Sequence, residues 1–146
     1  MFKKTLSLIL AISLMFSLTF FSNAKNDNTY ALSRNETGVQ PFYTYTNDYT
    51  TIINISNGSV CCTADVTGYS STTKITITMT LQKKTLFWWS DIETWTTTVY
   101  NFTALLSGTV YNVDSGTYRT KAVYTVYSGN DSETITGYSQ ETKYQS

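Results

Sequence analysis

The segment Thr73–Lys83 alternates apolar and polar side chains without interruption, and this pattern constrains the fold more than any other feature of the chain. In an extended strand successive side chains point to opposite faces, so the apolar residues gather on one face and the threonines on the other. A slip of one residue would expose the whole apolar set, which specifies the register of this strand. The residues expected to face inward are Ile75, Ile77, Met79 and Leu81.

Similar short segments follow from Pro41 onward, separated by turn residues at intervals of about 8–12 residues, as in a sandwich or barrel. The single proline and the abundant threonine and tyrosine favour strands. Asn57-Gly58 predicts a type I′ hairpin turn, because that turn needs two positive φ angles. We therefore expect an all-β domain, an antiparallel sandwich of about six or seven strands. The predicted strands are Tyr49–Asn57, Ser59–Thr67, Thr73–Lys83, 102–106, Gly116–Tyr127 and Ser132–Tyr138.

One stretch departs from simple alternation. Residues 84–100 place Trp89, Ile92 and Trp95 three positions apart, which predicts a hairpin followed by a strand with a bulge. The next segment returns to strand spacing and is expected to end at Ser107-Gly108. The inward rows of the remaining strands are Val60, Cys62, Ala64 and Val66, then Phe102, Ala104 and Leu106, then Tyr118, Thr120, Ala122, Tyr124 and Val126.

The N-terminus has the composition of a secretory signal peptide. Lys3 and Lys4 precede an apolar run, and small residues stand at Ser22 and Ala24. We expect cleavage after Ala24, because this site is well formed and the apolar run is at the short end for spanning a bilayer. The chain then divides into a signal peptide (1–24), a polar and flexible lead-in (25–41) and one domain (42–146). The expected location is extracellular, either released or loosely associated with the cell wall.

The composition argues against several function classes. Removing Lys3 and Lys4 from the ten basic residues leaves eight against ten acidic ones, which argues against nucleic acid and anionic membranes as partners. The chain has no histidine, the commonest metal ligand and general base. Asp91 and Glu93 are expected to share a solvated strand face, whereas glycosidases place two carboxylates across a cleft. We expect no catalysis, no cofactor and no metal site.

Residues 114–120 read Asp-Ser-Gly-Thr-Tyr-Arg-Thr and resemble the Asp-x-Gly-x-Tyr-x-Cys corner of immunoglobulin-like domains. The resemblance implies an immunoglobulin-like sandwich with structural roles for Asp114, Gly116 and Tyr118, the hydroxyl of Tyr118 tying the corner to nearby backbone. Thr120 stands where antibody-type domains carry their second cysteine, and Cys62 resembles the first. The usual disulfide between the sheets therefore cannot form.

A wider resemblance runs from about Pro41 to Ser139. The strings GSVCCTADV, TKITITMTLQKK, GTYRTKAVYTVYSG and SETITGYS, with a tryptophan-rich stretch among them, are similar to a family of small secreted proteins of Gram-positive bacteria without an assigned function. This resemblance implies secretion and a sandwich, and it implies no catalytic residue.

Aromatic residues between 87 and 95 form the candidate binding site. One or two of the rings should fill the interior, but three consecutive aromatics on an alternating strand cannot all point inward. At least one is therefore expected at the surface, where aromatic rings suit stacking on sugars, contact with a protein or insertion into a lipid interface. Lys83 and Lys84 beside them either favour anionic surfaces or serve solubility. The candidate residues are Phe87, Trp88, Trp89 and Trp95.

Cys61 and Cys62 are adjacent, so their side chains should point to opposite faces of a strand. A disulfide between them would need a distorted peptide. Cys62 is expected inward as a small buried hydrophobe. Cys61 is expected to face outward, either as an inert thiol or paired with another chain.

These observations favour a secreted, non-catalytic binding or structural module acting outside a Gram-positive cell. A surface glycan, an envelope polymer or a protein is the expected partner, and membrane contact is not expected after the signal peptide is removed. The alternative is a secreted antagonistic (bacteriocin-like) or immune-modulating protein. Such a protein would show a strong net charge or an exposed amphipathic face.

Overall fold

The computed structural model describes residues 29–33 and 42–146, so the predicted signal peptide lies outside the described residues. In the described part of the chain no helix is formed, and hence none that could cross a membrane. The strands are β1 (Thr29–Ser33), β2 (Thr46–Ser56), β3 (Ser59–Gly68), β4 (Lys74–Lys84), β5 (Trp89–Val99), β6 (Thr103–Val110), β7 (Gly116–Ser128), β8 (Asp131–Tyr138) and β9 (Thr142–Tyr144).

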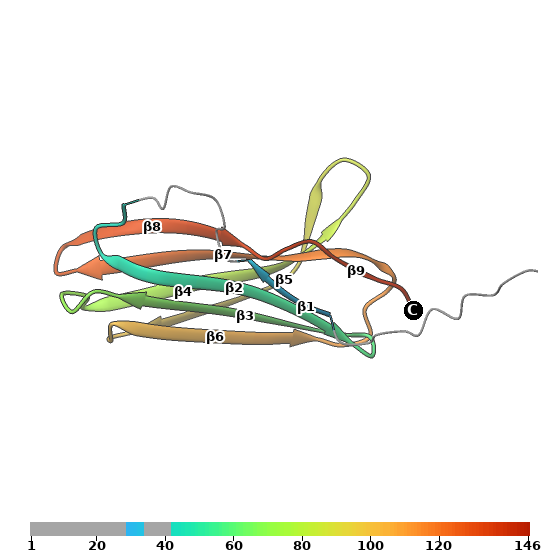
Figure 1. Cartoon of the computed structure of the whole chain (residues 1–146), viewed down its shortest axis with the longest axis horizontal. Helices are drawn as coiled ribbons and strands as arrows, with labels where there is room; N and C mark the ends of the chain where they lie inside the picture. The colour runs from blue at the N-terminus through green and yellow to red at the C-terminus, as the bar shows by residue number, and fades with distance from the viewer. Residues whose placement is uncertain (1–28, 34–41) are drawn as a thin grey trace, which may run out of the picture.

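The strands form two antiparallel sheets that pack as a sandwich (Figure 1). Sheet A has the strand order β1-β2-β3-β6. Sheet B has the order β5-β4-β7-β8, and β9 pairs with the start of β7. The predicted all-β antiparallel sandwich is thus confirmed.

The alternating rows predicted from the sequence form the core between the sheets. The apolar row of β4 is fully buried against the rows of β3 and β7. Its threonines lie on the outer face of sheet B and pair with threonines of β5, as Thr76 does with Thr98 at 3.0 Å. Asn57 and Gly58 have φ angles of 49° and 73°, so the predicted turn between β2 and β3 is confirmed.

Two strands lie where none was predicted. Residues 25–41 were expected to form a flexible lead-in, but Thr29–Ser33 pair with β2 and become the edge of sheet A. Thr142–Tyr144 pair with Gly116–Tyr118 of β7 as β9. Both are short additions that satisfy backbone groups along a neighbouring strand, and such pairing leaves little trace in side-chain patterns.

The predicted end of a strand at Ser107-Gly108 is wrong, because β6 continues to Val110. Gly108 stands inside the strand for a packing reason. A Cβ atom there would lie 2.4 Å from the indole of Trp95. Phe102, expected inward, instead lies in the turn before β6 and is 52% exposed.

The corner before β7 carries the hydrogen bond that the immunoglobulin resemblance implies. The hydroxyl of Tyr118 donates to the carbonyl oxygen of Asp114 at 2.7 Å. Both cysteines, which lie within the described residues, are free. Cys62 is fully buried, and burial raises the pKa of its thiol to about 11, an effect that the side chain of Thr120 partly offsets. Cys62 is therefore the buried hydrophobe predicted, and Cys61 is partly exposed.

Candidate functional site

The end of the β4–β5 hairpin projects from the sandwich (Figure 1). Its turn carries Leu86, Phe87 and Trp88, with side chains that are 91%, 86% and 63% exposed. These three residues form what we call the hairpin tip. Phe87 and Trp88 thus occupy the surface, as expected for at least one of the consecutive aromatics.

Thr85 closes the turn that holds the hairpin tip. Its backbone N–H and its hydroxyl both donate to the carbonyl oxygen of Trp88, at 2.8 and 2.7 Å. The N–H of Trp88 donates back to the Thr85 hydroxyl at 3.2 Å. The polar groups at the base of the tip are therefore bonded to one another, while the apolar side chains point away from the fold.

A bulge at Ile92 sends Trp89 and Trp95 to different faces of sheet B. Trp95 lies opposite Met79 and packs against the core, which is the interior position expected for one or two of the rings. The register then shifts by one residue, and Trp89 lies opposite Lys84 on the outer face. The predicted bulged strand is confirmed.

The same bulge corrects the expectation for the two carboxylates of this strand. Glu93 pairs with Leu81, and Asp91 pairs with Gln82. Leu81 and Gln82 point to opposite faces of β4, so Asp91 and Glu93 do not share a face. Asp91 instead accepts a hydrogen bond from the Gln82 amide at 2.7 Å.

Trp89 lies against a charged side chain of β7. The guanidinium carbon of Arg119 is 4.1 Å from the centroid of the Trp89 ring and 4.5 Å from that of Tyr138. The two rings come from β5 and β8, which lie on opposite sides of β7 in the sheet. Cation–π attraction of this kind contributes roughly 0.5–2 kcal/mol per ring. We call these three residues the arginine stack.

Gln82 binds the Nε of the Arg119 guanidinium and so holds it in place. The Nε of Arg119 donates to Oε1 of Gln82 at 2.8 Å, and the Gln82 side chain is only 7% exposed although it lies on an outer face. Because Asp91 accepts from its amide nitrogen, the orientation of Gln82 is set by both neighbours. Among the described residues the structure gives no partner for the two Nη groups of Arg119. The site therefore presents two N–H groups of a held guanidinium.

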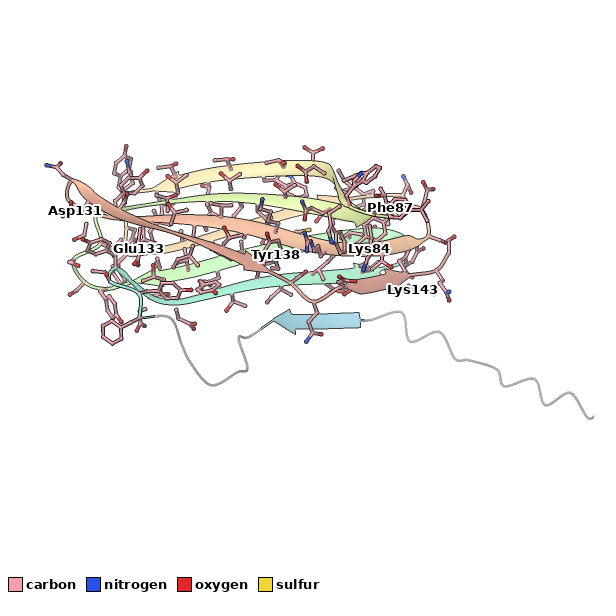
Figure 2. The ribbon with its side chains drawn as sticks, turned by 90° about the horizontal axis from the view of Figure 1, so that it is seen from above. Lys84, Phe87, Asp131, Glu133, Tyr138 and Lys143 are labelled. Atoms are coloured by element: carbon pink, nitrogen blue, oxygen red, sulfur yellow. The ribbon has the colours of Figure 1, made fainter. Side chains whose placement is uncertain are left out.

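Charge is distributed unevenly along the long axis of the domain. We call the end that carries the β4–β5 turn the hairpin end. In residues 42–146, all basic side chains except Lys74 come from strand segments near the hairpin end, and they are Lys83, Lys84, Arg119, Lys121 and Lys143. Figure 2 shows Lys84 and Lys143 toward this end and Asp131 and Glu133 at the opposite end. The acidic residues at the hairpin end are Asp91, Glu93, Asp114 and Glu141. Glu141 is paired with Lys84 at 2.8 Å. Five basic residues thus stand against four acidic ones, which leaves an excess of one positive charge at this end.

Three residues of this site were not singled out from the sequence. Gln82 and Arg119 were predicted only as outward residues of their strands, Arg119 at a variable position of the corner motif, and Tyr138 only as the end of a strand. The alternation along this strand did predict that Arg119 faces outward. Its proximity to Trp89, however, depends on the strand order and on the Ile92 bulge.

No family model matches the chain, and no curated protein or solved structure is significantly similar to it. The function must therefore be argued from the geometry of the site.

Proposed function

We propose that this chain is an exported, immunoglobulin-like, non-catalytic binding module that acts outside a Gram-positive cell. It engages its partner through the hairpin tip and the arginine stack. The immunoglobulin-like assignment is supported by the strand order, with β2-β3-β6 facing β5-β4-β7-β8, and by the Tyr118–Asp114 hydrogen bond at the corner. Export is supported by the N-terminal sequence pattern.

The observation that carries the proposal is that the Arg119 guanidinium is held in place while part of it stays available for binding. Two rings and the Gln82 carbonyl hold its guanidinium, while both Nη groups lack a partner among the described residues. A guanidinium fork binds a carboxylate or phosphate through two parallel hydrogen bonds. A fork that is already held loses less conformational entropy on binding. The site is therefore suited to an anionic group on the partner.

The carboxylates nearest the stack support binding rather than catalysis. Asp91 is held by Gln82, and Glu93 lies on the other face of β5. Acid–base hydrolysis of a glycoside uses two carboxyl groups that flank one bond. Asp91 and Glu93 have no such relation.

A second candidate function, an antagonistic or membrane-active protein, is favoured by one observation. The hairpin tip is an exposed apolar surface beside basic residues, which is the amphipathic feature that this class requires. Immune modulation would use the same surface against a host protein.

The test of the proposed function is a tryptophan-fluorescence titration with isolated wall polymers, lipid vesicles and host extracellular proteins. Arg119→Gln is expected to weaken binding of the true partner by about tenfold or more, because a charge-assisted bidentate contact is lost. The matched control is Lys74→Gln, since Lys74 lies on the same face, 3.8 Å from the Tyr127 ring, but at the other end. Equal affinity of wild type and both variants for every partner would refute the proposal, provided that all three melt at similar temperatures.

A further inference from the structure

We propose that the partner of this surface is an anionic phospholipid bilayer, into which the hairpin tip inserts while the arginine stack contacts lipid phosphates. The inference rests on the proposed function and names its partner. It departs from the sequence-based expectation that the exported domain makes no membrane contact. That expectation rested on the net charge that remains after the signal peptide is removed, and a net charge does not show how charge is distributed.

The hairpin tip has the composition and exposure of an interfacial anchor. Leu86, Phe87 and Trp88 are consecutive, and no charged residue lies between Lys84 and Asp91. Transfer of such exposed apolar side chains from water to an apolar phase is favourable. Tryptophan is enriched at the membrane interface, where an apolar ring and a polar N–H are both accommodated.

The polar groups at the base of the turn reduce the cost of placing it in a medium of low polarity. A lipid phase offers no water to unpaired N–H and C=O groups, so an inserted segment must satisfy them internally. In this turn the N–H of Thr85, the N–H and C=O of Trp88 and the Thr85 hydroxyl are bonded to one another. These four groups at the base of the tip are therefore already hydrogen-bonded when the tip meets the bilayer.

Electrostatics favour insertion with the hairpin end toward the membrane. Five of the six basic residues of 42–146 lie at the hairpin end together with four acidic ones, whereas Lys74 and the acidic Asp131 and Glu133 lie at the opposite end (Figure 2). Each basic side chain near an anionic bilayer contributes about 1 kcal/mol of attraction, which falls off within a Debye length. An anionic surface thus attracts the hairpin end and repels the other.

The same contacts disfavour a neutral glycan at this surface. The Trp89 ring is already engaged by Arg119 at 4.1 Å and lies 5.5 Å from the ammonium of Lys84. The rings of Phe87 and Trp88 are 6.3 Å apart and inclined at 36°, so they do not form one flat platform for sugar rings. Apolar rings on a projecting turn are better suited to a penetrable phase.

The experiment is co-sedimentation of the signal-free protein with vesicles of phosphatidylglycerol and, separately, of phosphatidylcholine. We expect binding to phosphatidylglycerol only, with no competition from inorganic phosphate. Phe87→Ser with Trp88→Ser should reduce the partition coefficient by about tenfold for each side chain removed from the apolar phase. These residues are exposed, so the double variant is expected to fold normally. Tyr100→Ser is the control, because Tyr100 is 85% exposed at the opposite end.

Lipids brominated on the acyl chains test insertion itself. Quenching of tryptophan fluorescence is expected in the wild type and should fall sharply in Trp88→Phe, which keeps an apolar side chain and should still bind. Absence of binding to phosphatidylglycerol, or unchanged binding by the double variant, would overturn the inference. If the protein does not bind vesicles but binds a wall polymer, and Arg119→Gln weakens that binding, the inference is wrong and the proposed function stands. If Arg119→Gln alters no interaction, both fall.

Discussion

The indole of Trp95 lies directly on the backbone of Gly108, on the facing edge strand of the other sheet. A Cβ atom at residue 108 would lie 2.4 Å from Cδ2 and Cε2 of the ring. β5 and β6 are edge strands of different sheets, so this contact closes one side of the sandwich. It leaves no room for any side chain at residue 108.

Gly108→Ala is therefore expected to destabilise the fold by about 1–3 kcal/mol, the usual cost of overpacking a well-packed site. Urea denaturation measures it as a lower midpoint. In a Trp95→Phe background the added methyl group meets a smaller ring, so the cost should be reduced. The same cost in both backgrounds would show that Trp95 is not the obstacle.

Tyr118→Phe removes the hydroxyl that donates to the Asp114 carbonyl at 2.7 Å. The loss of one partly buried hydrogen bond should lower the free energy of unfolding by about 0.5–1.5 kcal/mol. Tyr100→Phe is the control, because the Tyr100 side chain is 85% exposed. Equal effects of the two substitutions would contradict a structural role for the corner.

Thr120→Cys is expected to form a disulfide with Cys62. Both positions are fully buried in facing sheets, and they match the two cysteine positions of antibody-type domains. The new bond should stabilise the fold by about 2–4 kcal/mol under oxidising conditions. Thiol titration of the oxidised, denatured variant should then detect only Cys61. Titration of all three thiols would show that the two positions are not in bonding geometry.

Glu133 anchors the segment that leads into β2. Its carboxylate accepts hydrogen bonds from the N–H groups of Thr44 and Tyr45, both at 2.8 Å. Burial raises the pKa of Glu133, but the hydrogen bonds outweigh it and hold the pKa below its usual value of 4.5. Because the folded-state pKa is depressed, this stabilisation is present above the unfolded pKa and is lost as pH falls through the folded pKa.

Glu133→Gln should accordingly be less stable than wild type at neutral pH. The difference between the two urea midpoints should shrink as the pH is lowered past the usual glutamate pKa. A difference that stays constant from neutral to acid pH would show that the carboxylate charge is not the stabilising element.

Alternation alone predicted most of the core, because burial on one face imposes a period of two on β3, β4 and β7. It did not predict where sheets close. Ser107-Gly108 looks like a turn in the sequence. The reason for a glycine at residue 108 is its contact with Trp95 of the other sheet, which the sequence does not show. The pairing of β1 and β9 depends on backbone hydrogen bonds, to which side-chain patterns are nearly blind.

The candidate site was predicted only in part for a related reason. The exposure of at least one of the three consecutive aromatics was predicted, because they cannot all point inward. Which of them lie at the surface was not predicted. The position of Trp89 beside Arg119 depends on a one-residue bulge and on the order of four strands. The sequence indicated the bulge but not which partners it would bring together.

The central claim is that the hairpin tip is the part of the domain that contacts the partner bilayer. The most direct test compares amide spectra of ¹⁵N-labelled protein on small isotropic phosphatidylglycerol bicelles with and without a lipid spin-labelled in its acyl chain. Signals of residues 85–90 should lose intensity first, while those of Gly129 and Asn130, in the turn at the opposite end, persist. Uniform loss along the chain, or loss centred on the turn between β5 and β6, would contradict the account.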